Sequence, residues 1–103
     1  PPHCHSAEEE IFVVLDGEGV LLLWEPEDVS EHPVRAGSVI TRPPGTGVAH
    51  AFRAGEGGLT LLAYGTREPD DICFYPRSGN VFFRGIGLVT RLGGPLDYWD
   101  GED

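Results

Sequence analysis

Residues 1–17, PPHCHSAEEEIFVVLDG, decide the fold of this chain and hold most of a candidate metal site. His3 and His5 are two residues apart. In an extended chain, side chains at i and i+2 leave the same face, so both imidazoles can point at one atom while Cys4 points the other way. From Glu10 onward the run is apolar and β-branched, with alternate residues on opposite faces. The stretch therefore predicts a strand that starts with a carboxylate close to two histidines.

Turn residues punctuate the rest of the chain and predict one all-β domain over residues 1–103. Fifteen glycines and nine prolines separate short apolar runs, and no window keeps a helical stripe over several turns. Glycine-containing turns predict two hairpins, 11–15 with 20–24 around 16–19, and 48–53 with 59–64 around 55–58. Seven or eight short strands with such turns are typical of a sandwich or barrel.

The segments outside these hairpins are less regular. Residues 25–33 are acidic, contain two prolines and predict an exposed loop, and the paired prolines within 42–47 predict a rigid turn. Further strands are expected at 38–41, 72–75, 81–83 and 86–91. The tail, residues 92–103, is expected to dock on the body through Leu96, Tyr98 and Trp99.

Charge and composition exclude several classes of function. The formal net charge of −10, from 17 acidic and 7 basic residues, opposes binding to nucleic acid and to anionic membranes. All seven basic residues are arginines, so lysine Schiff-base chemistry is excluded. No apolar segment is long enough for a signal peptide or a membrane span, and Cys4 and Cys73 form no metal-type pair. We therefore expect a reduced, cytoplasmic protein with buried, unreactive thiols.

The spacing of residues 1–17 resembles the first metal motif of the cupin superfamily. That motif runs glycine, five residues, His-x-His, three or four residues, Glu, six residues and Gly. Here His3, His5, Glu10 and Gly17 fit this spacing, without the leading glycine.

Residues 37–54 resemble the second motif of the same superfamily, which runs glycine, five residues, Pro-x-Gly, two residues, His, three residues and Asn. Gly37, Pro43 and Gly45 match in spacing, the histidine follows after four residues as His50, and Ala54 replaces the asparagine. The asparagine is not a metal ligand, so its replacement leaves the site intact.

The resemblance covers roughly residues 1–64 and implies a cupin-type double-stranded β-helix, a jelly-roll barrel. It implies one metal site with the ligands His3, His5, Glu10 and His50. Such a ligand set suits Mn, Fe, Ni, Cu or Zn and points away from Mg and Ca. Complete cupins have strands before the first motif, so the chain is expected to lack its N-terminal strand or strands. A second subunit, forming a homodimer, or a second cupin domain is expected to cover the open edge.

The three consecutive glutamates leave an alternative for the carboxylate ligand. Glu9 competes with Glu10, because the family also allows a gap of three residues. Glu10 is preferred because its distance to Gly17 fits the motif, and Glu8 and Glu9 are expected to be exposed.

The predicted function is a metal-binding cupin domain that acts on a small polar or anionic organic molecule, with oxygenase, decarboxylase or isomerase chemistry. The alternative is a non-catalytic cupin that binds a small ligand or uses its metal structurally. Tyr64 is the one general acid or base that strand alternation offers. Arg42 and Arg53 could clamp an anionic substrate, although surface charge pairing is the plainer expectation.

Overall fold

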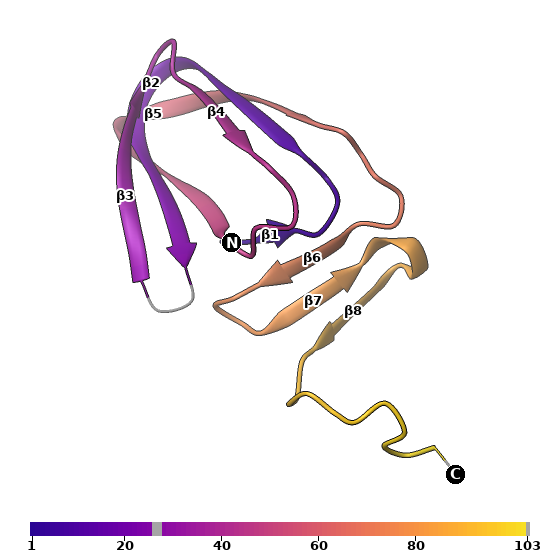
Figure 1. Ribbon diagram of the computed structural model, residues 1–103. Coiled ribbons are helices and arrows are strands. Elements are labelled where there is room, and N and C mark those ends of the chain that lie inside the picture. Colours follow the sequence, from indigo (N-terminus) through magenta and orange to yellow (C-terminus); the bar gives the residue numbers. More distant parts are fainter. Residues whose placement is uncertain (26–27, 103) are drawn as a thin grey trace.

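Eight strands and one short 3-10 helix make up the secondary structure in the computed structural model, which describes residues 1–25 and 28–102. In chain order these are β1 (Cys4–His5), β2 (Glu10–Glu25), β3 (Asp28–Arg35), β4 (Val39–Arg42), β5 (Ala49–Gly65), β6 (Ile72–Tyr75), β7 (Asn80–Phe83), η1 (Arg84–Ile86) and β8 (Leu88–Arg91). The predicted all-β fold class is confirmed (Figure 1). Within the described residues, no helix is long and apolar enough to cross a membrane.

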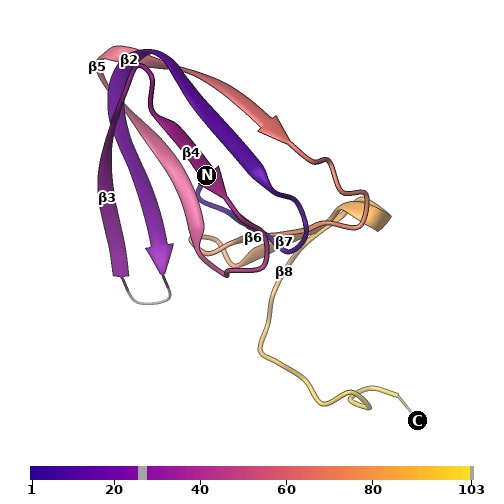
Figure 2. The same ribbon diagram turned by 45° about the horizontal axis from the view of Figure 1, so that its top comes forward.

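The strands form two antiparallel sheets. In the first sheet β2 pairs with β5 along most of its length, with β4 near its start and with β3 near its end. The second sheet has the order β1-β6-β7-β8. Two backbone hydrogen bonds between His3 and His50, of 3.2 and 2.9 Å, join the start of the chain to the start of β5. Figures 1 and 2 show β2, β3 and β5 curving as an arch above the second sheet.

The two predicted hairpins are wrong, because residues 11–24 lie within one continuous strand, β2, and residues 49–64 lie within another, β5. The two strands pair with each other instead of folding back on themselves. The predicted turn at 16–19 coincides with two register shifts between Val14 and Gly19. A glycine with positive φ can bulge and bend a strand as readily as it can reverse the chain, and here it bends the strand.

Gly17 lies where β2 packs directly against the backbone of β5. Its φ is +84°, a left-handed conformation that side chains rarely adopt. A Cβ atom at this position would overlap the carbonyl oxygen of Gly58 on β5. The glycine that ends the first motif is therefore required by the packing of β2 against β5.

Three other expectations need correction. Residues 28–35 form β3 rather than a loop, because they pair with the end of β2; residues 26–27 of the predicted loop lie outside the described residues. The predicted strand at 86–91 begins only at Leu88, after η1. The tail does not dock: Leu96, Tyr98 and Trp99 are all exposed, Tyr98 by 85%, and the rings of the last two pack on each other at 5.0 Å. Asp103 lies outside the described residues.

The hydrophobic core fills the inner side of the arch. Val14, Leu21 and Val34 are its buried centre, and the partly buried side chains packed against them are Leu23, Ile40, Phe52, Leu59 and Leu61. Phe12 extends this core, because its ring lies 5.0 Å from that of Phe52 and 5.4 Å from that of His50. The inner face of β2 thus leads from the core to the histidines.

Candidate metal centre

Four side chains from three strands or their flanks converge beside the core. Oε1 of Glu10 lies 2.7 Å from Nε2 of His5, 3.1 Å from Nε2 of His50 and 3.7 Å from Nε2 of His3. The donor atoms of His3, Glu10 and His50 all lie within 4.8 Å of one another. The structure therefore brings together the four residues that the motifs select, including His50 from the second motif.

Three of these converging atoms are buried and lack a hydrogen-bond partner within the described chain: Nε2 of His5, Nε2 of His50 and Oε1 of Glu10. They are close together but are not aligned as hydrogen bonds. Buried polar atoms nearly always find partners, so unsatisfied atoms aimed at one point need an explanation. Neutral imidazole nitrogens and a carboxylate are the donors that first-row transition metals prefer, and the residues fit such an ion.

Contacts within the cluster set its electrostatics. Burial acts to raise the pKa of the Glu10 carboxyl, but the contacts with His5 and His50 outweigh it and hold this pKa well below its usual range. The contact with Glu10 raises the pKa of His5 to about 9 against the effect of burial, and Asp71 adds to the rise. Burial lowers the pKa of His3, whose Nδ1 donates a hydrogen bond to the Pro1 carbonyl. His3 therefore presents a neutral Nε2 to the cluster.

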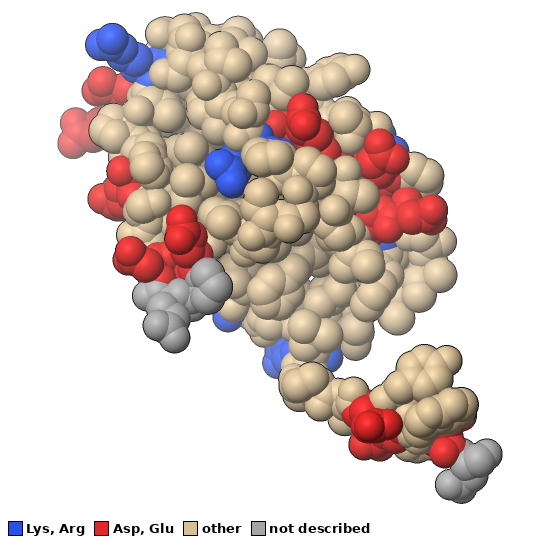
Figure 3. All heavy atoms as spheres, in the orientation of Figure 1, with Lys and Arg blue, Asp and Glu red and all other residues tan. Residues whose placement is uncertain are grey.

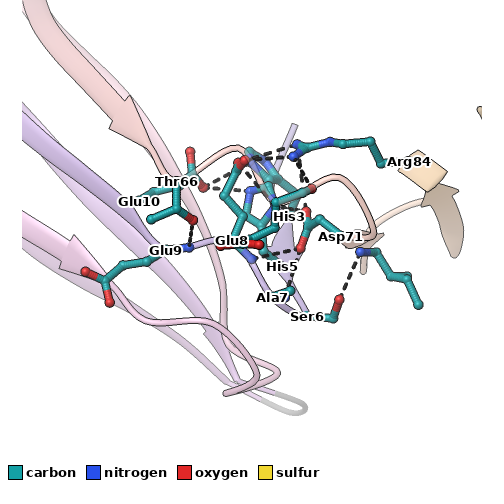
Figure 4. Close-up of polar contacts among 12 residues, drawn as sticks. His3, His5, Ser6, Ala7, Glu8, Glu9, Glu10, Thr66, Asp71 and Arg84 are labelled. Carbon is teal, nitrogen blue, oxygen red and sulfur yellow. Dashed lines mark hydrogen bonds and ion pairs between the residues drawn. The ribbon is translucent and has the colours of Figure 1, made fainter.

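Asp71 orients His5 from the connection before β6 (Figure 4). Its carboxylate is 1% exposed, and Oδ2 accepts a hydrogen bond of 2.6 Å from Nδ1 of His5. Oδ1 accepts hydrogen bonds from the backbone amides of Ala7 and Glu8, at 2.9 and 3.0 Å. A proton held on Nδ1 leaves Nε2 as the metal-facing atom, which is how carboxylates fix metal-binding histidines.

The three glutamates have three different environments. Glu8 is buried, contrary to expectation, because Nη1 of Arg84 donates a hydrogen bond of 2.8 Å to its Oε1. Glu9 is exposed, and its backbone amide donates to Oγ1 of Thr66. Glu10 alone turns its carboxylate toward the three histidines. Figure 4 shows the side chain of Glu9 pointing away from this cluster.

A cavity of about 490 Å³ lies beside His3 on the second sheet; its lining residues are Pro1, Tyr75, Ser78, Asn80, Phe82 and Val89. The cavity opens on the same face of the second sheet as the histidines. Cys73 on β6 lies directly opposite His5 on β1 and Phe82 on β7, so these three side chains share that face. The ring of Tyr75 lies 5.8 Å from that of His3. The cavity and the metal cluster are thus neighbours.

Two of the other candidates lie away from the cluster. Tyr64 pairs with Ile11, on the face of the sheet opposite to that of Glu10, and is 69% exposed. The structure therefore does not bring it to the histidines, because residues 10 and 11 of one strand point to opposite sides. Arg53 forms an exposed ion pair of 2.8 Å with Glu31, which is the surface charge pairing expected from the sequence.

The sequence reasoning missed the residues that support the cluster from the second half of the chain. Asp71, Tyr75 and Arg84 act across more than 60 residues of sequence, and strand pairing over that distance has no local signature. The one available signal is an acidic pair, Asp70 and Asp71, immediately before an apolar strand.

Comparisons with known proteins give the family and the fold of the chain. Residues 1–63 match the family described as Cupin domain. No curated protein matches the chain.

Among solved structures, a candidate sugar phosphate isomerase from Acidithiobacillus ferrooxidans is 28% identical, with a TM-score of 0.74 over 86% of this chain and 55% of that one. A sugar phosphate isomerase of the cupin superfamily from Silicibacter pomeroyi is 27% identical, with a TM-score of 0.72 over 94% of this chain and 62% of that one. Vicilin from hazelnut, Corylus avellana, is 23% identical with a TM-score of 0.57 over 71% of this chain and 22% of that one, a likeness of fold alone. The chain thus spans 55% and 62% of the lengths of the two isomerase structures.

Proposed function

Because the chain belongs to the cupin superfamily, we propose that it is a metal-dependent cupin domain that isomerises a small phosphorylated sugar. The observation that carries the proposal is the convergence of three imidazole Nε2 atoms on Oε1 of Glu10. The same ligand set also suits oxygenases and decarboxylases. The names of the two isomerase structures favour isomerisation among these classes.

The ligands of the proposed ion are His3, His5, Glu10 and His50, and Mn, Fe, Ni, Cu and Zn all suit them. When bound, such an ion supplies a Lewis acid that polarises a sugar carbonyl and acidifies the neighbouring C–H bond. Asp71 holds the proton of His5 on Nδ1 and so keeps Nε2 directed into the cluster.

The cavity beside His3 is the proposed place for the body of the substrate. The side chains of Tyr75, Ser78 and Asn80 offer hydroxyl and amide groups that can hydrogen-bond to sugar hydroxyls. Phe82 and Val89 supply an apolar wall, against which the carbon face of a sugar can pack and exclude water.

Two side chains of the second sheet next to the cluster, Cys73 and Tyr75, act as proton donors rather than bases. Burial raises the pKa of the Cys73 thiol to about 11, and burial together with its contact to Cys73 raises the pKa of Tyr75 to about 12. Both are protonated at neutral pH. Tyr75 is thus suited to donate a hydrogen bond to a substrate oxygen.

The decisive experiment is metal analysis and an isomerase assay on protein purified without a histidine tag. We expect wild type to bind about one transition-metal ion per chain and to interconvert aldose and ketose phosphates. We expect the His50→Ala and Glu10→Ala variants to lose both the metal and this activity. His32→Ala is the matched control, because His32 is exposed and hydrogen-bonds only to Ser30 in the described structure. Metal content unchanged in both ligand variants would refute the proposal.

The cavity beside His3 has no carboxylate or histidine among its described lining residues, and this favours a second candidate. Isomerisation needs a base to carry a proton between neighbouring carbons, whereas Cys73 and Tyr75 both hold their protons. The second candidate is a non-catalytic cupin domain in which the metal is structural. Stoichiometric metal without turnover of any phosphorylated sugar tested would select it.

The expectation of a homodimer or of a second cupin domain is kept as part of the proposal. Its support is an exposed apolar outer face on the first sheet, where Val39 and Leu62 flank Val13 and Tyr64 lies beside them. Sedimentation analysis of the whole chain tests the homodimer. If the chain is a monomer at micromolar concentration, a second cupin domain is the remaining partner for this face.

A further inference from the structure

We propose that Arg42 is the residue that anchors the phosphate group of the substrate at the metal centre. The inference rests on the proposed function and names the part of the site that selects an anionic substrate. It comes from the position of Arg42 opposite Glu10 and from its buried Nε, which has no hydrogen-bond partner within the described residues.

Arg42 is the cross-strand neighbour of the carboxylate ligand. It ends β4, and in the antiparallel register it lies directly opposite Glu10, the first residue of β2. Directly opposed residues of antiparallel strands project from the same face, with Cβ atoms about 4.5–5.5 Å apart. Ile40, two residues earlier on the same strand, packs against the core. Arg42 therefore belongs to the inner face of the arch, which carries the metal cluster.

The guanidinium of Arg42 is partly buried without compensation. Its Nε is buried and has no hydrogen-bond partner, and among the described residues it forms no ion pair. Arg53 and Arg84, by contrast, pair with Glu31 and Glu8 at 2.8 Å. Burying an unsatisfied charged donor costs free energy, and a chain with 17 acidic residues could easily have supplied a partner. An anionic ligand bound at this site would supply the hydrogen-bond acceptor that Arg42 lacks.

The backbone around Arg42 is fixed relative to the metal cluster. The turn that follows it contains Pro43 and Pro44, and the backbone amide of Gly45 donates a hydrogen bond of 2.9 Å to the carbonyl of His5. Arg42 is therefore held between β2, which carries Glu10, and β1, which carries His5. Such a fixed position is what an anchoring residue needs to place a substrate at a metal.

The chemistry of the group selects phosphate. A guanidinium presents its donors as a planar fork that matches two oxygens of a phosphate, and it keeps its charge at all working pH values. On the face drawn in Figure 3, acidic side chains gather at the edges of the body and on the tail, and basic ones are few and scattered. An anionic substrate is repelled by most of this surface, so one unpaired arginine inside the arch has a large effect on where it binds.

The test is the affinity of the whole chain for inorganic phosphate, measured by isothermal titration calorimetry. We expect Arg42→Gln to weaken phosphate binding about 10-fold to 100-fold, as the loss of charge-assisted hydrogen bonds does. Arg42→Lys keeps the charge without the fork and should give an intermediate loss. Arg53→Gln is the matched control, since it removes an exposed, paired guanidinium, and should change the affinity less than about twofold.

A phosphate affinity equal to that of wild type in Arg42→Gln overturns the proposal, as does a wild-type protein that binds no phosphate. Arg91 is the competing anchor, because it hydrogen-bonds to Asn80 at the cavity. Loss of affinity in Arg91→Gln but not in Arg42→Gln also overturns the proposal. Gluconate is titrated in parallel. If it binds more tightly than phosphate, and if this binding depends on Arg42, the assignment of phosphate as the bound group is overturned.

A second measurement covers the case in which Arg42→Gln does not fold. Phenylglyoxal modifies arginines, and mass spectrometry of the treated wild type should show that phosphate protects Arg42; equal modification with and without phosphate counts against the anchor. Metal content separates the two proposals. Phosphate binding through Arg42 in a protein that retains no metal refutes the proposed function alone, whereas metal and isomerase activity with unaltered phosphate affinity in Arg42→Gln refutes the anchor alone.

Discussion

Replacing Asp71 with asparagine tests the orientation of His5 more directly than removing a ligand does. The Asp71 carboxylate uses one oxygen for Nδ1 of His5 and the other for the amides of Ala7 and Glu8. Asparagine has a single acceptor oxygen, so it can serve the imidazole or the two amides but not both, and its NH2 group then faces donors.

The magnitude follows from these contacts. One or two buried donors lose their acceptor, at about 1–3 kcal/mol each, so we expect the free energy of unfolding of metal-free protein to fall by about 2–4 kcal/mol. Loss of the carboxylate that orients a metal-binding histidine typically weakens metal affinity by about 10-fold to 100-fold, and the same is expected here.

Urea unfolding measures the first quantity, and competitive titration with a chelator measures the second. Asp70→Asn is the matched control, because Asp70 is the exposed neighbour of Asp71 and makes no side-chain hydrogen bond within the described residues. If Asp71→Asn unfolds at a lower urea concentration but binds metal as tightly as wild type, Asp71 supports the fold only, and the reasoning about His5 is wrong.

Three further predictions concern Gly17, His5 and Tyr64. Gly17→Ala should lower the free energy of unfolding by about 2–4 kcal/mol in urea denaturation, because its Cβ would meet a carbonyl of β5 at a positive φ; unchanged stability would contradict the close packing. The pKa of His5 is raised from 6.5 to about 9, so protonated His5 stabilises metal-free protein fully below pH 6.5 and this stabilisation is lost as pH rises through 9. Calorimetry should show the melting temperature of metal-free protein falling across that window; a rise would contradict the assignment. Tyr64→Phe should leave metal content and turnover unchanged, since Tyr64 lies on the outer face, and a large loss of turnover would return it to the site.

The parts of the site that the sequence predicts are those encoded by short-range alternation and motif spacing. His3 and His5 leave the same face of an extended segment, and Glu10 starts the next strand, so their approach follows from local geometry. His50 could be selected only by its resemblance to a motif. Its place in the cluster depends on a pairing with His3 across 47 residues, which periodicity does not encode.

The two hairpin errors have a common physical cause, which is that glycine serves two backbone geometries. Gly17 and Gly58 both have positive φ, as turn residues do, yet each lies within a strand that continues through it. A run of glycines indicates a break in regular pleating but not whether the chain reverses or bends. The tertiary pairing of β2 with β5 makes that choice, and it joins residues between 25 positions (Trp24 and Ala49) and 55 positions (Glu10 and Gly65) apart.

The bending of β2 is also what closes the metal centre. His50 pairs with Leu23, near the end of β2, whereas Glu10 is the first residue of that strand. A straight strand would separate positions 10 and 23 by about 43 Å, at about 3.3 Å per residue. Nevertheless Nε2 of His50 lies 3.1 Å from Oε1 of Glu10. Only a strand that curves round can bring its two ends to one point, so the glycine that lets β2 bulge against β5 is as necessary to the cluster as the ligands. Gly17→Ala should therefore weaken metal binding as well as the fold, although Gly17 itself touches no ligand.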